Sequence, residues 1–191
     1  FDGASFSLQD GEKVGIIGVN GTGKTTLLRM IMGEEETDEG TVTTANHVVI
    51  RYLPQHPEFE PEKSCLECVL EGYVTDENRW SVERDAKAMM MRLGIKEFMK
   101  PAGQLSGGQR KRLALISVLL SPADILRLDE PTNHLDNDMA DWLEDYLKKW
   151  RGALIMVTHD RYFLDSVCNR IEEIDKGIIF SIQTNYSGYL E

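Results

Sequence analysis

KVGIIGVNGTGKTTLLRMIMG, residues 13–33, is the stretch that decides the fold. It begins as an apolar strand, passes through a glycine-rich turn and continues as a helical segment that Gly33 ends. Residues 18–25 match the spacing G-x-x-x-x-G-K-[ST] in the strand–turn–helix setting that a phosphate-binding loop requires. This order of elements predicts the first unit of a parallel α/β sheet.

The glycine loop has the chemistry to hold a triphosphate. Its backbone amides and the start of the following helix attract phosphate oxygens, and glycine allows the backbone a close approach. Lys24 adds a positive charge, Thr25 is placed to bind Mg²⁺, and Thr26 is placed to reach an α-phosphate oxygen. We therefore predict nucleotide binding by the residues of this loop: Gly18, Asn20, Gly21, Thr22, Gly23, Lys24, Thr25 and Thr26.

The segments after the loop have three different patterns. Residues 40–53 are rich in β-branched residues and predict short antiparallel strands, closed by Pro54. Residues 64–99 have apolar positions at three- and four-residue spacing and predict a helical lobe with a stop at Gly94. From Ser106, helices and strands alternate, which specifies a parallel sheet. We expect helices at 106–120, 138–150 and 161–171, strands at 123–130 and 153–160, and a terminal hairpin around Lys176 and Gly177.

Composition sets limits on the protein class. The 191 residues are 41% hydrophobic, enough for a packed core, and no run is long and apolar enough for a membrane span, so we expect a cytoplasmic location. A net charge of −11 argues against nucleic-acid binding through a broad basic surface. Cys65 and Cys68 read as thiols one helical turn apart rather than a metal site, and Met89–Met91 reads as core filling rather than a binding surface.

A pair of carboxylates follows the apolar strand that ends in ILRLDE. Asp129 is placed to support a hydrated Mg²⁺, and Glu130 to orient or deprotonate a water that attacks the γ-phosphate. His159 follows the next predicted strand, where an imidazole could hydrogen-bond that phosphate. The alternative, two solvated carboxylates that open a turn before Pro131, would be the ordinary reading of the dipeptide alone.

The segment LSGGQRKR, residues 105–112, predicts a second anion site. Ser106 is a candidate N-cap, and Gly107 and Gly108 leave the first amides of the helix uncovered. We count Gln109 with them as a nucleotide-binding candidate. One phosphate loop and one separate anion site imply two nucleotides or two chains.

Together these motifs resemble the ABC ATPases. Residues 18–25 correspond to Walker A, Gln55 to the Q-loop, 105–109 to the signature, 125–130 to Walker B and His159 to the switch histidine; Leu135 and Asp136 match the D-loop. The resemblance implies an ABC-type P-loop NTPase with a mainly parallel RecA-like core, an antiparallel β subdomain and a helical subdomain. It also implies ATP and Mg²⁺ as cofactors, with Gln55 contacting the metal and the water.

The same resemblance implies a domain division and a partner. The chain would be one ATPase domain over 1–191, with its core in 1–55 and 104–191 and its helical lobe in 56–103. Two such domains would meet head to tail, each ATP lying between one Walker A loop and the opposite signature, so that Ser106, Gly107 and Gly108 serve the partner's nucleotide.

Within that superfamily, three segments are similar to the ABC-F class: EPTNHLD at 130–136, THDRYFLD at 158–165 and NYSGYLE at 185–191. This implies the first of two ATPase domains in one soluble chain, of the Uup-like branch, that acts on ribosomes during translation, with some members conferring antibiotic resistance. The alternatives are an ATPase subunit of a membrane transporter, which shares every catalytic motif, and a nucleotide-binding interaction module without hydrolysis.

Arg127 departs from the family pattern, which keeps this strand apolar. By alternation it shares a face with Asp129. Burying an unpaired guanidinium would cost several kcal/mol. We therefore predict that Arg127 pairs with a carboxylate or reaches solvent at the end of the strand.

Overall fold

The computed structural model describes residues 11–18, 49–72, 74–175 and 178–182. The predicted phosphate loop beyond Gly18, the helix after it and the first part of the 40–53 segment lie outside these residues. The following description therefore concerns the sheet, the second α/β block and the helical lobe.

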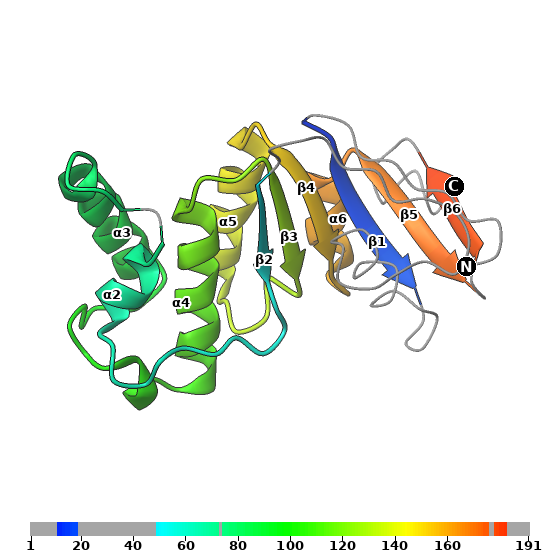
Figure 1. The fold of residues 1–191 in the computed structure, drawn as a ribbon. Helices are drawn as coiled ribbons and strands as arrows, with labels where there is room; N and C mark the ends of the chain where they lie inside the picture. Colours follow the sequence, from blue (N-terminus) through cyan, green and yellow to red (C-terminus); the bar gives the residue numbers. More distant parts are fainter. Residues whose placement is uncertain (1–10, 19–48, 73, 176–177, 183–191) are drawn as a thin grey trace, which may run out of the picture.

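A mainly parallel sheet forms the centre of the molecule (Figure 1). Its six strands have the spatial order β2-β3-β4-β1-β5-β6. All neighbouring pairs are parallel except β5 and β6, which form the terminal antiparallel pair expected around residues 176–177. The strands are β1 (Lys13–Gly18), β2 (Ile50–Leu53), β3 (Ile125–Asp129), β4 (Ala153–Val157), β5 (Arg170–Asp175) and β6 (Ile178–Ile182).

The direction of β2 corrects the prediction of antiparallel strands for residues 50–53, while residues 40–48 lie outside the described part. Ile50 pairs with Ile125 and Leu53 with Leu128 in a parallel register. The β-branched composition of the segment indicated a strand, but composition carries no information about strand direction. The parallel register brings the residues after β2 to the same edge of the sheet as the residues after β3.

The helices follow the predicted pattern. In Figure 1, α5 and α6 lie behind the sheet, and α4 lies between the edge strand β2 and the α2–α3 pair at one end of the molecule. Their bounds are α2 (Cys65–Leu70), α3 (Arg79–Arg92), α4 (Gly107–Leu120), α5 (Asn137–Lys149) and α6 (Arg161–Val167), with a short 3₁₀ turn at Ala102–Gln104.

Side-chain caps define several helix starts. Ser64 and Ser106 each accept a hydrogen bond from the third helical amide, and the side chains of Glu67 and Gln109 return the bond to the cap amide. Such a capping box satisfies two amides that the helix itself leaves unpaired. The predicted cap at Ser106 is thus confirmed.

The end of α6 comes four residues earlier than predicted. Cys168 takes an extended backbone conformation, and Asn169 bonds to the backbone of Lys13 through its own amide and its side-chain oxygen. The following residues then pair with β1 as strand β5. The helical pattern of this segment gave no sign of that switch, because the strand partner lies more than 150 residues away in the chain.

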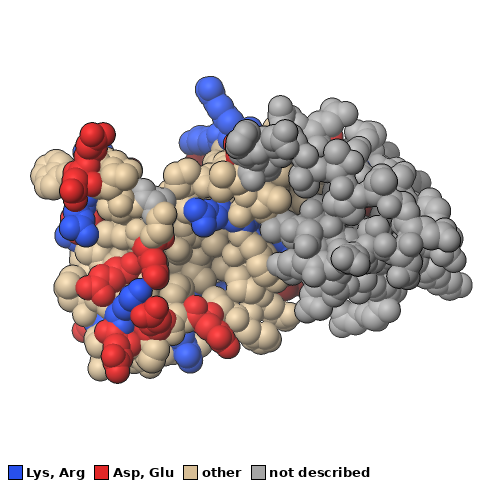
Figure 2. Space-filling model, in the orientation of Figure 1, with Lys and Arg blue, Asp and Glu red and all other residues tan. Residues whose placement is uncertain are grey.

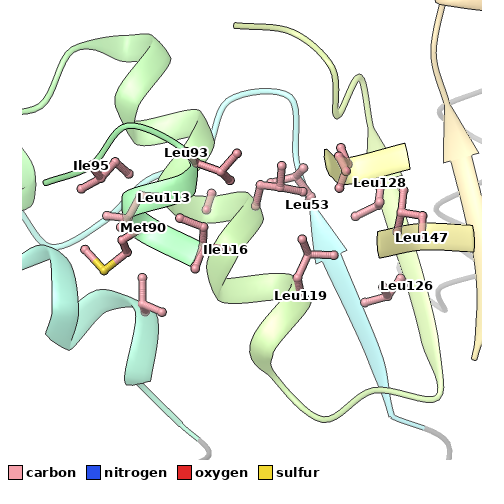
Figure 3. Close-up of a cluster of buried hydrophobic side chains, with 14 of the residues drawn as sticks. Leu53, Met90, Leu93, Ile95, Leu113, Ile116, Leu119, Leu126, Leu128 and Leu147 are labelled. Atoms are coloured by element: carbon pink, nitrogen blue, oxygen red, sulfur yellow. The ribbon is translucent and has the colours of Figure 1, made fainter. Parts of the chain in front are cut away.

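One continuous apolar core connects the sheet to the helical lobe. Figure 3 shows Leu126 and Leu128 of β3 beside Leu147, with Leu113 and Ile116 of α4 leading from there to the lobe. Burial of each such side chain stabilises the fold by about 1.5–3 kcal/mol. Because α4 contributes to both parts of the core, side-chain packing fixes its position relative to the sheet.

In the helical lobe, the cysteines agree with the prediction, and the methionines agree with it in part. Cys65 and Cys68 lie one turn apart on α2, both buried as free thiols, and burial raises the pKa of Cys68 to about 11. Met90 is buried and Met89 partly buried, as expected for core filling, but Met91 is 51% exposed.

The surface of the lobe is strongly charged. In Figure 2, the acidic side chains visible on this face gather over the lobe that contains α2 and α3. No helix within the described ranges has the length and apolar character that crossing a membrane requires.

Candidate active site

Three neighbouring strands bring the predicted catalytic residues to one edge of the sheet. Asp129 ends β3 and Glu130 follows it, Gln55 comes two residues after β2, and His159 comes two residues after β4. Since β2, β3 and β4 are adjacent and parallel, their carboxyl ends lie side by side. This is the edge at which open α/β sheets bind ligands.

Asp129 is held by a buried cation and a phenol. Arg127, on the same face of β3, places Nη2 3.2 Å from Oδ2 and Nε 3.4 Å from Oδ1, and only 2% of its side chain is exposed. Tyr52, which is the register partner of Arg127 on β2, donates its hydroxyl to Asp129 Oδ2 at 3.0 Å. Its ring also lies 4.0 Å from the guanidinium carbon, within the range of a cation–π contact.

The predicted pairing of Arg127 with a carboxylate is therefore confirmed. The guanidinium pairs with Asp129 and lies over the Tyr52 ring, and both contacts offset part of the cost of burying an arginine. The pair also fixes the orientation of the carboxylate at the end of the strand.

Glu130 sits in a turn that the surrounding residues impose on it. Its φ of +49° lies in the left-handed region, which costs a residue with a side chain about 1–2 kcal/mol. The Glu130 amide donates to the Val157 carbonyl at 2.7 Å, which holds the turn against β4. Backbone strain of this kind persists where the surroundings enforce it, commonly at functional sites.

The side chain of Glu130 is oriented by the residues after β4. Thr158 donates its hydroxyl to Glu130 Oε2 at 3.1 Å, and the His159 amide lies 3.3 Å from the same oxygen. The His159 imidazole Nε2 lies 3.5 Å from Oε1, while 69% of its side chain is exposed. The carboxylate is thus anchored through one oxygen, and the ring beside the other oxygen remains open to a ligand.

The side chain of Lys111, on α4, reaches the same edge at the ends of β2 and β3. Its ammonium donates to three backbone carbonyls: Asp129 at 3.0 Å, Pro54 at 3.2 Å and Gln55 at 3.4 Å. The residue is only 4% exposed, and its burial lowers the pKa of the ammonium, although the Asp129 and Glu130 carboxylates act in the opposite direction. The side chain of Gln55 itself is exposed.

The start of α4 forms the second predicted anion site. Ser106 and Gln109 are used by the capping box, with the Ser106 amide donating to Gln109 Oε1 at 3.0 Å. The amides of Gly107 and Gly108 belong to the first turn, where no intrahelical carbonyl is available to them. A side chain at Gly107 would meet nothing within 4 Å, whereas one at Gly108 would contact His134 at 3.4 Å, so the helix end is open on the Gly107 side.

The structure thus brings together one group of predicted residues and leaves another outside its described part. Asp129, Glu130, His159 and the Gln55 backbone share one edge, whereas the phosphate-loop residues from Asn20 to Thr26 are not among the described residues. Three residues that contact this group were not predicted from sequence motifs: Tyr52, Lys111 and Thr158. Thr158 stands beside His159 and was within reach of a motif argument; the other two required knowledge of which strands are neighbours.

The donor chemistry at this edge suits a nucleotide-bound magnesium ion. Carboxylate oxygens are preferred ligands of Mg²⁺, directly or through its water shell. Asp129 and Glu130 supply them from one strand end, with side chains 17% and 15% exposed. Asp129 already accepts bonds from Arg127 and Tyr52, so it fits best as a support for metal-bound water.

Comparison with known proteins identifies the family. The family profile described as "ABC transporter" matches residues 1–133. The chain belongs to the ABC transporter family. The match covers well over half of this ABC chain and ends three residues after the carboxylate pair, within the turn at residues 131–134.

Two bacterial proteins are among the relatives of this chain. Over its whole length this ABC chain is 38% identical to "Uncharacterized ABC transporter ATP-binding protein YfmR" of Bacillus subtilis (strain 168) and covers 36% of that protein. Over 98% of its length it is 34% identical to "Energy-dependent translational throttle protein EttA" of Escherichia coli (strain K12), of which it covers 40%. The ABC chain therefore spans well under half the length of these relatives.

Solved structures establish the fold of the ABC chain. It superposes on "Structure of ATP binding subunit of ABC transporter" with a TM-score of 0.83 over 94% of its length and 82% of that chain, at 18% identity. It superposes on a dimeric post-hydrolysis state of the ATP-binding cassette MJ0796 bound to ADP and Pi with a TM-score of 0.78, covering 94% and 88%, at 24% identity. The predicted ABC-type α/β P-loop NTPase class is confirmed.

Proposed function

We propose that this chain is one of two ATPase domains of an ABC-F protein that hydrolyses ATP while acting on the ribosome. The observation that carries the hydrolysis is the anchored Glu130 carboxylate, with the His159 ring 3.5 Å away at the edge of the sheet. The translational role is supported by 34% identity to EttA, described as an energy-dependent translational throttle protein, and by the three ABC-F-like sequence segments.

Each residue at the edge has a role in this proposal. Glu130 accepts a proton from, or orients, the water that attacks the γ-phosphate, and Thr158 and the His159 amide keep one of its oxygens fixed. The His159 ring bonds the γ-phosphate. Asp129 supports the water shell of Mg²⁺, and the Gln55 side chain contacts the metal and the attacking water. The bound metal supplies positive charge that offsets the charge of the triphosphate.

The phosphate loop and the signature complete the proposed site. Residues 18–26 hold the triphosphate of this domain, with Lys24 and Thr25 at its charged end. The amides of Gly107 and Gly108, in the first turn of α4, bind the nucleotide of the partner domain. In this arrangement the two domains meet head to tail, and a single domain carries two half-sites.

The domain division and location belong to the same proposal. Residues 1–191 form one ATPase domain, with a core from 1–55 and 104–191 and a helical lobe from 56–103, and the protein works in the cytoplasm. A ribosomal partner is supported also by the structural likeness to ribosome-bound archaeal ABCE1, at 29% identity and a TM-score of 0.75 over 92% of this chain and 31% of that one.

Ribosome retention by a hydrolysis-deficient variant tests the proposal. Glu130→Gln in the complete protein that contains this chain keeps the shape of the side chain but removes the base, so the ATP-bound state should accumulate on ribosomes. We expect Glu130→Gln to sediment with ribosomes in ATP and not in ADP, while exposed Asp145→Asn behaves like the wild type. ATP retention without ribosome binding, in a protein whose remaining sequence contains membrane spans, would instead indicate a transporter subunit.

A further inference from the structure

Lys111 connects the signature helix α4 with the Gln55 segment and with the strand end that precedes Glu130. It lies on α4, two residues after the capping box that Ser106 and Gln109 form, and its ammonium sits where β2 and β3 end. Its bonds go to the carbonyls of Pro54 and Gln55 and to the carbonyl of Asp129, immediately before Glu130.

The Lys111 side chain holds α4 at a fixed distance from the ends of β2 and β3. A lysine ammonium has three N–H donors and no acceptor, and each donor here has a carbonyl partner at 3.0–3.4 Å. The aliphatic stem is buried, because the whole residue is only 4% exposed. Within the described residues, no carboxylate oxygen lies within 4.0 Å of the ammonium, so its bonds are directed to backbone.

Burying the Lys111 ammonium costs hydration free energy, and the need to fill space in the core does not account for a charged residue here. An apolar residue of similar length would fill the same space without the loss of hydration that a buried charge suffers. Lysine offers instead three charge-assisted hydrogen bonds to peptide groups, which are stronger than bonds between neutral groups. Those bonds set the distance between the start of α4 and the two strand ends.

We propose that Lys111 is a positioning residue that couples the signature helix to the Gln55 segment and to Glu130. This inference rests on the proposed ATPase function. When a partner's nucleotide settles at Gly107 and Gly108, any movement of α4 is passed through the Lys111 ammonium to the carbonyls of Gln55 and Asp129.

The test compares Lys111→Met with Lys111→Arg and Lys149→Met in the complete protein. Methionine keeps the length of the stem and loses the donors, arginine keeps a cationic donor, and Lys149 is an exposed lysine of α5. We expect Lys111→Met to lower kcat for ATP about tenfold to a hundredfold, as a small misplacement of catalytic groups does. Its KM for ATP should stay within about twofold of the wild-type value. Lys111→Arg should recover most of kcat, and Lys149→Met should match the wild type.

A second readout does not depend on hydrolysis. In nucleotide-free protein, deuterium uptake by residues 53–58 should rise in Lys111→Met and not in Lys149→Met, because the carbonyls of Pro54 and Gln55 lose their tether. Should Lys111→Met fail to fold, Lys111→Gln, which keeps a shorter amide donor, replaces it in both measurements.

The outcomes separate the two proposals. Wild-type kcat together with wild-type uptake in the Lys111 variant would overturn the coupling role, as would a change in KM alone. If Glu130→Gln abolishes hydrolysis in the same assay, that failure leaves the ATPase proposal intact. If the wild type itself does not hydrolyse ATP, the proposed function fails, and the uptake difference still decides whether Lys111 holds the Gln55 segment.

Discussion

Arg127 is a buried cation within the sheet, and its contacts with Asp129 and Tyr52 stabilise its charge. It pairs with Asp129 and lies against the Tyr52 ring, while its Nη1 has no hydrogen-bond partner among the residues that the structure describes. Alternation along β3 was sufficient to predict that Arg127 and Asp129 share a face, because side chains two residues apart on a strand point the same way. The contribution of Tyr52 was not predictable, because it depends on which strand lies beside β3 and in what register.

Arg127→Met should destabilise the fold by leaving Asp129 without its cation. Removal of one partner from a buried ion pair typically costs about 3–5 kcal/mol, and we expect the lower end here because Asp129 is partly exposed. Chemical denaturation of Arg127→Met, Asp129→Asn and the double variant measures the coupling, which should exceed about 1 kcal/mol. Additive losses in the double variant would show that the two side chains do not stabilise each other.

At the scale of elements, the sequence predicted which segments are strands and helices better than where they end or how they run. Apolar periodicity and the Ser106 cap located α4 and the strands on either side of α5. It did not locate the end of α6, which is decided by the pairing of Asn169 with the backbone of Lys13. Likewise, the parallel direction of β2 follows from its neighbour β3 and not from its own composition.

The contact between α5 and α6 provides a test at this scale. Ser166 of α6 donates a hydrogen bond to Glu144 of α5, which also accepts from Lys148 at 3.0 Å. These bonds, the one from Ser166 first, lower the pKa of Glu144 from its ordinary 4.5. A carboxyl with a lowered folded-state pKa stabilises the fold above its unfolded pKa and loses that contribution as the pH falls through the folded value.

Ser166→Ala should therefore lower the free energy of unfolding in a pH-dependent way. We expect a loss of about 1.5 kcal/mol at pH 7, the range for a bond to a charged group. The loss should shrink as the pH falls below about 4.5, where the unfolded carboxyl becomes protonated. Urea denaturation at several pH values measures it, with the exposed Ser81→Ala as the control. An equal loss at pH 7 and at pH 3 would contradict a role for the ionised carboxylate.

At the scale of the whole molecule, the arrangement explains why the site could be predicted only in part. Motifs named Asp129, Glu130 and His159, because each follows a recognisable strand, and adjacency of β3 and β4 then places them together. The tether from Lys111 spans elements far apart in the sequence, and no local pattern marks it. The proposed second half-site belongs to another domain, so its geometry is a property of an assembly and not of this chain.

In the proposed function, Glu130 orients the water that attacks the γ-phosphate. Single-turnover hydrolysis of ATP by the complete protein, wild type against Glu130→Gln, tests it most directly, with Asp145→Asn as the matched exposed control. Loss of a positioned base should slow the step by about a hundredfold or more while ATP remains bound. An unchanged rate in Glu130→Gln with bound ATP would contradict the account.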